Sequence, residues 1–268
     1  MGRKYVVAMD QAKLQTLFDL TGRTAIITGG TRGIGRAIAE GFIAAGANVV
    51  VSSRKADACE ETEAHLNSMS GSAGGSARAL PTNMGATETP AALVGATVEA
   101  FGGVDIVVNN AANALALPIG SQTPEGWSKS FEVNLRGPAL LIQEATPHLT
   151  ESDHASVINI SSVGAYLAGS HVSMYASMKA AMLALTRSYA AELGPHNIRV
   201  NSLAPGTVDT DMTRNAPFGT PESMSSHQII KRPAHADEMV GPALFLASDA
   251  SSFVTGQTLL ADGGMHPR

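Results

Sequence analysis

The chain has 268 residues, enough to bury a sizeable core in one α/β domain. Hydrophobic residues make up 44%, charged residues 15%, and the net charge is −5, so no basic field would attract nucleic acid or an anionic membrane. The single cysteine, Cys59, excludes an intrachain disulfide and a thiolate metal cluster, and fits a reducing, cytoplasmic setting.

Residues 1–20 are expected to form an N-terminal extension with one amphipathic turn. They contain early basic residues but neither a long apolar stretch nor a small-residue cleavage pattern, so they do not resemble a signal peptide. No apolar run approaches the roughly 18 residues that a membrane-spanning helix needs. We therefore expect no membrane partner and one domain over 21–268.

From Arg23 onward, short apolar or β-branched runs alternate with longer segments of helical spacing. Strands are expected at 24–28, 48–53, 77–81, 104–109, 156–161, 198–203 and 258–260. Helices are expected at 34–45, 57–69, 89–101, 124–149 (in one or two segments), 174–193 and 236–246, with an irregular stretch at 205–231. The alternation predicts a single doubly wound, Rossmann-type α/β domain, a parallel sheet with helices on both faces, whose ligands bind beyond the carboxyl ends of the strands.

A glycine-rich turn, T-G-G-T-R-G-I-G at 28–35, lies between the first expected strand and the first expected helix. Glycine permits a positive φ and lacks the Cβ that would keep a pyrophosphate from the amino end of the helix. The turn therefore predicts nucleotide binding, with a ligand-free glycine turn as the alternative. The expected contacts are Gly29, Thr31, Arg32, Gly33, Ile34 and Gly35.

The end of the second expected strand, S-S-R-K at 52–55, indicates which dinucleotide binds. An acidic residue there would bond the ribose hydroxyls of NAD and repel a 2′-phosphate, whereas Ser53 is uncharged. Arg54 can bind a phosphate through two N–H groups, and Arg32 can approach the same group. These charges favour NADP(H) over NAD(H), unless Arg54 and Lys55 are merely solvated residues opening a helix.

Three side chains between 162 and 179 are the candidate catalytic group. Tyr175 and Lys179 are four residues apart and share one face of a helix. Because a neighbouring cation favours phenolate, we expect Lys179 to lower the pKa of Tyr175 and make it a usable proton donor and acceptor. Ser162, from a separate strand, could bond the same substrate oxygen. The alternative is a chance Y-x-x-x-K pair on a solvated helix.

Together these motifs resemble the short-chain dehydrogenase/reductase family, from about Thr21 to the end of the chain. The glycine turn, the N-N-A-A segment at 109–112, F-E-V-N-L around Asn134, I-S-S ending at Ser162 and the Y-x-x-x-K pair follow the family's order. Family members have a glycine at the position of Ala112, so this chain adds a Cβ near the cofactor.

The resemblance implies a role for each catalytic candidate. Tyr175 would be the acid/base, Lys179 would lower its pKa and bind the nicotinamide ribose, Ser162 would polarise the carbonyl, and Asn134 would hold a water that links Lys179 to solvent. An amide, Asn83, stands where the family usually has an acidic residue near the adenine. Further implied cofactor contacts are Met84, Asn110, Ala111, Ala112, Pro205, Gly206, Val208 and Thr210. The family also implies a homotetramer or homodimer, formed through 135–149, 174–193 and 256–264.

Other candidate chemistry is weaker. The eight histidines lack ligand spacing, so no metal is expected. His171 could touch substrate but is more simply a solvated loop residue. Asp209 and Asp211 follow a proline-glycine turn and are expected to cap the next helical segment.

The long irregular segment at 207–231 has the length of a lid or substrate loop. The expected substrate contacts are Leu115, Leu117, Ser162, Leu167 and Met212. The apolar character of the four residues other than Ser162 predicts an apolar or 3-oxoacyl-type ketone, which would be reduced to a secondary alcohol with NADP(H). Two alternatives remain open: an NAD-dependent alcohol or steroid dehydrogenase, and a non-catalytic NADP(H)-binding sensor.

Overall fold

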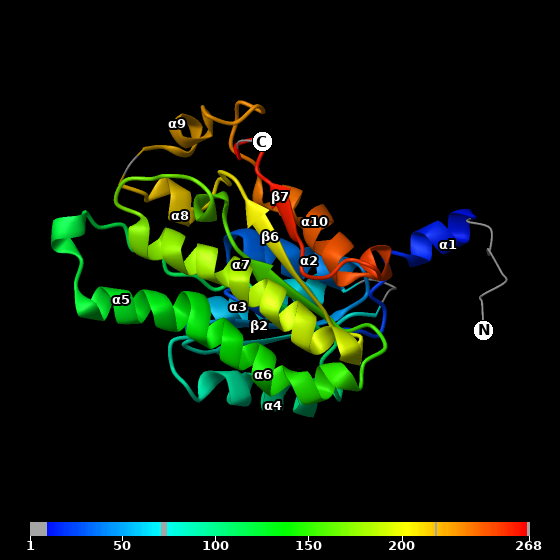
Figure 1. Ribbon diagram of the computed structural model, residues 1–268. Coiled ribbons are helices and arrows are strands. Elements are labelled where there is room, and N and C mark those ends of the chain that lie inside the picture. Colours follow the sequence, from blue (N-terminus) through cyan, green and yellow to red (C-terminus); the bar gives the residue numbers. More distant parts are fainter. Residues whose placement is uncertain (1–9, 71–73, 218, 267–268) are drawn as a thin grey trace.

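A central parallel sheet organises the computed structural model, which describes residues 10–70, 74–217 and 219–266 (Figure 1). Within these residues the sheet has seven strands in the order β3-β2-β1-β4-β5-β6-β7, all parallel. The strands are β1 (Thr24–Thr28), β2 (Asn48–Ser53), β3 (Ala77–Pro81), β4 (Ile106–Asn109), β5 (Ser156–Ile160), β6 (Arg199–Pro205) and β7 (Thr258–Ala261). The predicted doubly wound α/β fold is confirmed.

Helices cover both faces of the sheet (Figure 1). One face carries α2 (Gly33–Ala44), α3 (Ala56–Met69) and α10 (Val240–Ala247), and the other carries α4 (Thr89–Phe101), α6 (Gly137–Thr150) and α7 (Ser173–Leu193). Because β1 and β4 are neighbours whose following helices lie on opposite faces, the chain reverses direction between them. A crevice forms at the carboxyl ends of strands at such a point.

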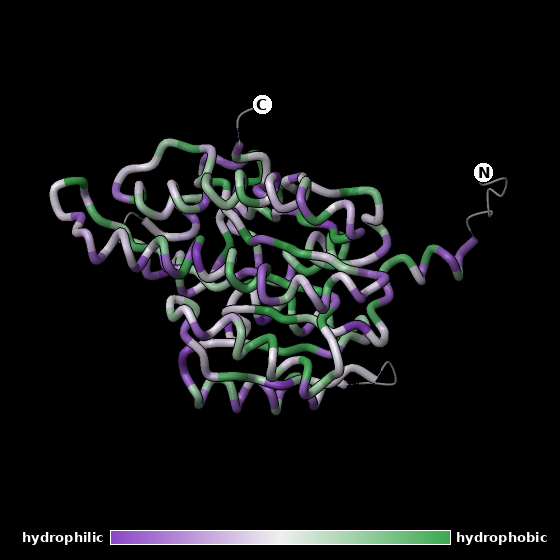
Figure 2. Tube along the Cα trace, turned by 60° about the horizontal axis from the view of Figure 1, so that its bottom comes forward, coloured by the Kyte–Doolittle hydropathy of each residue, from purple (hydrophilic) through white to green (hydrophobic). Residues whose placement is uncertain are grey.

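Residues that alternate along the strands pack into two hydrophobic cores, one on each face of the sheet. In β1, Ala25 and Ile27 pack with Phe42 of α2, whereas Ile26 packs with Leu141 of α6 on the opposite face. Both directions are apolar because both faces of the sheet are covered. Figure 2 shows hydrophobic stretches running through the middle of the molecule. Leu20, which the sequence analysis places in the extension, is fully buried in the first core.

Short helices complete the described chain where the sequence analysis expected irregular or continuous structure. The predicted helix at 124–149 is divided into α5 (Pro124–Phe131), the π-helical turn η2 (Glu132–Arg136) and α6. The irregular stretch at 205–231 contains α8 (Asp211–Arg214) and α9 (Pro221–Ser225). The remaining short elements are α1 (Gln11–Thr16), η1 (Ile119–Ser121), η3 (Val163–Ala165), η4 (Gly194–His196), η5 (Ala236–Met239) and η6 (Asp249–Ser251).

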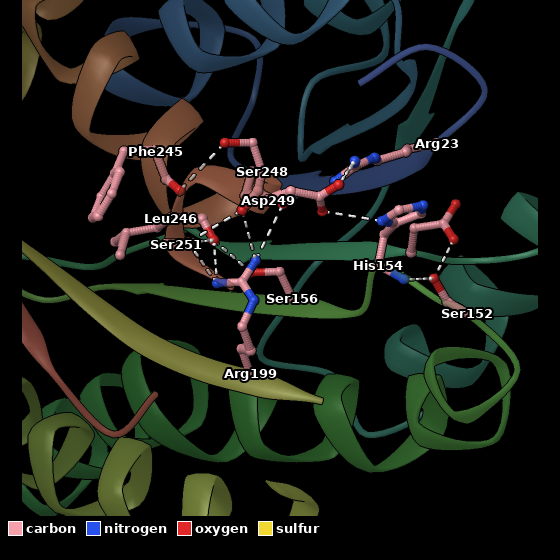
Figure 3. Close-up of polar contacts among 12 residues, drawn as sticks. Arg23, Ser152, His154, Ser156, Arg199, Phe245, Leu246, Ser248, Asp249 and Ser251 are labelled. Carbon is pink, nitrogen blue, oxygen red and sulfur yellow. Dashed lines mark hydrogen bonds and ion pairs between the residues drawn. The ribbon is translucent and has the colours of Figure 1, made fainter. Parts of the chain in front are cut away.

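A polar network ties the amino ends of the strands together (Figure 3). The buried Arg23, which precedes β1, pairs with Asp249 at 3.0 Å, and Asp249 also contacts His154 at 3.0 Å. Arg199 at the start of β6 donates to Leu246 O at 2.9 Å and to Ser251 Oγ at 2.6 Å, so it binds the carboxyl end of α10. The network therefore lies at the amino ends of the strands, whereas the glycine turn lies at their carboxyl ends.

Candidate active site

Three segments bring the predicted catalytic side chains together. Tyr175 and Lys179 lie one turn apart on α7, which packs against η3, and Ser162 is the residue that caps η3. Ser162 Oγ accepts from Gly164 N at 3.1 Å, which orients its side chain. The Lys179 ammonium donates to Ile160 O at 2.6 Å and lies 5.6 Å from the centre of the Tyr175 ring.

Burial controls the titration of this group. Burial raises the pKa of Tyr175 above its ordinary value of 10.0, and the nearby Ser162 hydroxyl opposes that shift. Burial also lowers the pKa of Lys179 to about 8. The predicted net lowering of the pKa of Tyr175 is therefore wrong for the free protein, because the net shift is upward. The ammonium bonds a main-chain oxygen, and the loss of hydration at the phenol dominates.

Asn134 lies in the π-helical turn η2 and is fully buried. Its side-chain oxygen accepts from Asn113 N at 2.9 Å, and its amide nitrogen donates to Asn113 O at 2.9 Å and to Ser130 O at 2.9 Å. Both ends of the amide are therefore bound to protein. The implied role of holding a water for Lys179 stays a prediction, and the observed bonds fix the start of the segment after β4.

The glycine turn has the backbone that its sequence predicts. Gly29 and Gly33 have φ values of +66° and +55°, which side chains with a Cβ rarely adopt. A Cβ on Gly35 would clash with the side-chain nitrogen of Asn110. That nitrogen donates to Thr28 O at 2.9 Å and to Gly29 O at 3.0 Å. Through these two hydrogen bonds, Asn110 joins the glycine turn to the end of β4.

A cleft of about 960 Å³ opens beyond the carboxyl ends of β1, β2, β3 and β4. The predicted cofactor contacts that line it are Gly29, Thr31, Arg32, Gly33, Ile34, Ser53, Arg54, Asn83, Met84, Asn110, Ala111, Ala112 and Thr210. Those that do not line it are Gly35, Tyr175, Lys179, Pro205, Gly206 and Val208. Of the catalytic pair on α7, Lys179 is buried and Tyr175 is half-buried, and neither lines the cleft. Ala112 has no left-handed backbone, so alanine fits its position.

Two hydroxyls that sequence reasoning missed lie at the ends of β2 and β3. The side-chain oxygens of Ser52 and Thr82 are buried, line the cleft and have no hydrogen-bond partner among the described residues. Their only sequence signal is their position at strand ends. The α5 and η2 residues of the cleft wall, which include Glu125, Lys129 and Glu132, carried no sequence signal.

Charges at the cleft mouth are partly paired. Arg32 donates to Asp211 at 3.1 Å, and both side chains are largely exposed. Arg54 is exposed and has no ion pair among the residues that the structure describes. The first helix of the 205–231 segment is thus linked to the glycine turn, while Arg54 stays available at the end of β2.

The segment after β6 differs from its prediction in the residue that caps its first helix. Thr210 caps α8 through a reciprocal pair with Thr213, so the expectation that Asp209 or Asp211 provides the cap is wrong. Thr210 has the extended backbone of a cap residue, whereas Asp209 pairs with Arg214 at 2.7 Å. Gly206 packs on Asp262, where a Cβ would meet the Asp262 backbone at 2.7 Å.

The expected substrate residues lie on two loops and one short helix. Leu115, Leu117 and Leu167 are half-buried, and Met212 is exposed and lines the cleft. His171 is exposed in the loop before α7 and has a left-handed φ of +67°.

The structure also bears on metals and membranes. Within the described ranges, no three His, Cys, Asp or Glu side chains gather into a group that could bind a metal. None of the described helices has the length and apolar character to span a membrane.

Known proteins resemble the chain over nearly its whole length. A family model described as Enoyl-(Acyl carrier protein) reductase matches residues 29–266. The "Probable galactose dehydrogenase GalD" of Rhizobium meliloti (strain 1021) is 35% identical over 250 residues, which cover 92% of this chain and 96% of that protein. The "Dehydrogenase/reductase SDR family member 4" of Homo sapiens is 36% identical, covering 93% and 89% of the two chains. A blue fluorescent protein from a metagenomic library, solved in complex with NADPH, has a TM-score of 0.86 and 31% identity, covering 93% and 100%.

Proposed function

The chain belongs to the short-chain dehydrogenase/reductase family, and from that membership we propose that it reduces a ketone to a secondary alcohol with NADP(H). Its family makes it an NAD(P)-dependent oxidoreductase that acts on alcohol or carbonyl substrates. The observation that carries the reductase proposal is the convergence of Ser162, Tyr175 and Lys179 beside the glycine-lined cleft. A pure NADP(H) sensor would not need this complete proton-transfer group.

The cleft suits a dinucleotide on two counts. Gly29 and Gly33 leave the amino end of α2 open in backbone conformations that favour glycine, as a bound pyrophosphate requires. Ser52 and Thr82 offer a polar ligand buried hydroxyls that have no hydrogen-bond partner in the described part of the chain. Arg32, Arg54 and Asn83 would hold the adenosine end. When bound, the reduced nicotinamide supplies a hydride to the carbonyl carbon.

The protein's own residues supply the proton. Tyr175 is protonated at neutral pH, since its ordinary pKa of 10.0 is raised further by burial, and it gives that proton to the carbonyl oxygen. Ser162 donates a hydrogen bond to the same oxygen. Lys179 carries a positive charge below about pH 8, and this charge favours the phenolate that remains after the transfer. The phenolate then regains a proton from solvent.

Charge supports NADP(H) over NAD(H). The cleft wall at the end of β2 has the uncharged Ser53 followed by the exposed Arg54, and no carboxylate stands at either position. A guanidinium binds a 2′-phosphate in a bidentate manner, which NAD does not offer. The metagenomic protein solved with NADPH, described above, is consistent with this choice.

We also propose a substrate class, an oligomeric state and a cellular location for the protein. The half-buried Leu115, Leu117 and Leu167 support an apolar or 3-oxoacyl-type ketone. Because one relative is named a galactose dehydrogenase, the substrate panel should also contain sugars. We also propose a homotetramer and, since the chain has one cysteine, a cytoplasmic location.

Loss of NADPH absorbance with a panel of ketones tests the reaction. Tyr175→Phe should lower kcat by about 100-fold or more, because the proton donor is removed. Tyr189→Phe, on the same helix but outside the site, is the matched control and should retain activity. Tight NADPH binding without turnover of any carbonyl would instead support a sensor. Turnover only of an alcohol with NAD would support the alcohol or steroid dehydrogenase.

A second variant tests the cofactor choice. Arg54→Asp should lower the preference for NADPH over NADH by about 10- to 100-fold, because a charge-assisted phosphate contact becomes a repulsion. Lys55→Asp makes the same charge change at a neighbouring residue that does not line the cleft, so its effect should be much smaller. An unchanged preference in Arg54→Asp would defeat the NADP(H) assignment.

A further inference from the structure

The segment 112–123 forms one side of the catalytic region. It begins at Ala112 in the cleft wall and ends at Thr123, whose hydroxyl caps α5. Apart from the short turn η1, it has no regular secondary structure, yet it carries Leu115 and Leu117. A segment of this kind keeps its position only through contacts to other elements.

Side-chain and main-chain hydrogen bonds fix the segment at its start and its middle. At the start, Asn134 bonds both the N–H and the carbonyl of Asn113 at 2.9 Å. In the middle, Leu117 N donates to His171 O at 2.7 Å. His171 adopts its left-handed conformation in the loop between Ser162 and Tyr175. Such a conformation persists only where its surroundings hold it.

Gln122 fixes the end of the segment. Its side-chain amide donates to Leu117 O at 3.3 Å and to Ser173 Oγ at 2.7 Å, and the amide is half-buried. Leu117 is therefore bonded on both sides, by His171 through its N–H and by Gln122 through its carbonyl. Ser173 is the first residue of α7 and lies two residues before Tyr175.

We propose that Gln122 is a positioning residue of the reduction, because it holds the Leu115 and Leu117 segment at a set place relative to the start of the helix that carries Tyr175. The proposal rests on the proposed reductase function. Gln122 touches neither proton nor hydride and acts through Leu117 and Ser173. Small misplacements of a substrate relative to the reacting group have large kinetic costs.

Gln122→Ala tests this role by steady-state kinetics on a ketone that the wild-type protein reduces. The loss of one or two net hydrogen bonds should lower kcat/KM for the ketone by about 5- to 30-fold. The dissociation constant of NADPH should not change, because Gln122 does not line the cofactor cleft. Gln143→Ala removes the same side chain from an exposed position on α6 and should behave as wild type.

A double-mutant cycle identifies the partner. If Gln122 acts through Ser173, the loss in Gln122→Ala/Ser173→Ala should be smaller than the product of the two single losses. Fully multiplicative losses would overturn the coupling. Equal losses in ketone kcat/KM and NADPH affinity would indicate general destabilisation and would also overturn it.

Hydrogen exchange gives a readout that does not depend on turnover. In the full-length protein, exchange in a peptide covering 112–123 should be about fivefold faster in Gln122→Ala than in wild type, because Leu117 loses a partner. Unchanged exchange would reject the positioning role. If the wild-type protein reduces no carbonyl, the proposed reaction fails, and exchange still tests whether Gln122 holds the segment.

Discussion

At the scale of single residues, burial decides the chemistry of the site. The phenol of Tyr175 and the ammonium of Lys179 share one helical face, and the expected coupling of their charges predicted a lowered pKa for Tyr175. The structure buries Lys179 and half-buries Tyr175, and the loss of hydration raises the pKa of Tyr175 and lowers that of Lys179 to about 8. Tyr175 is thus protonated at neutral pH, which is the state that reduction requires.

The pH dependence of the reaction follows from these two shifts. Reduction needs a protonated Tyr175 and a charged Lys179, so kcat/KM should be level below about pH 8 and fall above it. Oxidation of the alcohol needs phenolate and should rise with pH. Rate profiles in both directions check this expectation. A reduction rate that stays level to pH 10 would contradict the role of the Lys179 charge.

At the scale of elements, short helices at the sheet edge determine how the cleft is closed. The π-helical turn η2 turns Asn134 toward the segment after β4, and α8 places Asp211 against the glycine turn. Arg32 is therefore shared between α8 in this structure and the 2′-phosphate that we propose. An exposed ion pair of this kind contributes little stability but competes directly with a bound phosphate.

Asp211→Asn should release Arg32 for the cofactor. We expect KM for NADPH to fall about twofold at low salt, the factor typical of one exposed ion pair, with KM for NADH unchanged. Asp209→Asn is the control, since Asp209 pairs with Arg214 and not with Arg32. Steady-state kinetics with both cofactors measure the effect. An equal change for NADPH and NADH would argue against competition at Arg32.

At the scale of the whole molecule, the two ends of the parallel strands differ in structure. The carboxyl ends of the strands carry the glycine turn, the cleft and two hydroxyls that have no partner among the described residues. The amino ends of the strands are held by the network of Arg23, Asp249, His154 and Arg199, which Figure 3 shows. Asp249 links β1 to η6 within this network.

Asp249→Asn should destabilise the fold without changing the chemistry. Arg23 is buried and would lose its partner, so we expect a loss of about 2 kcal/mol in the free energy of unfolding, moderated by the partial exposure of Asp249. Burial raises the pKa of Asp249, but Arg23 and His154 lower it overall. The carboxylate's contribution is therefore present above its ordinary pKa of 3.8 and is lost as the pH falls through the lowered value.

Urea denaturation of Asp249→Asn and wild type at several pH values measures this effect. The difference between the two proteins should be largest near neutral pH and should shrink toward acid pH. Asp237→Asn, at an exposed residue, should cost much less. A difference that stays constant down to acid pH would show that the charge of Asp249 contributes nothing.

Sequence alone determined the elements that depend on local pattern. The strands Thr24–Thr28, Asn48–Ser53 and Ala77–Pro81 and the helix Thr89–Phe101 have the predicted bounds, because apolar periodicity and turn residues act within a few positions. The glycine turn was equally readable, since its left-handed backbone requires glycine. The resemblance in motif order then predicted the family, which the comparisons confirmed.

Only the tertiary structure decided the features that depend on residues distant in the chain. Strand β6 runs to Pro205 because that residue pairs with Ala261 of β7. Gln122 and Ser173 are 51 residues apart, and no local pattern could indicate their hydrogen bond. The pKa directions of Tyr175 and Lys179 likewise depend on burial, which arises only when the sheet, α7 and the loops pack together. Local spacing specifies elements, whereas burial and pairing require the whole fold.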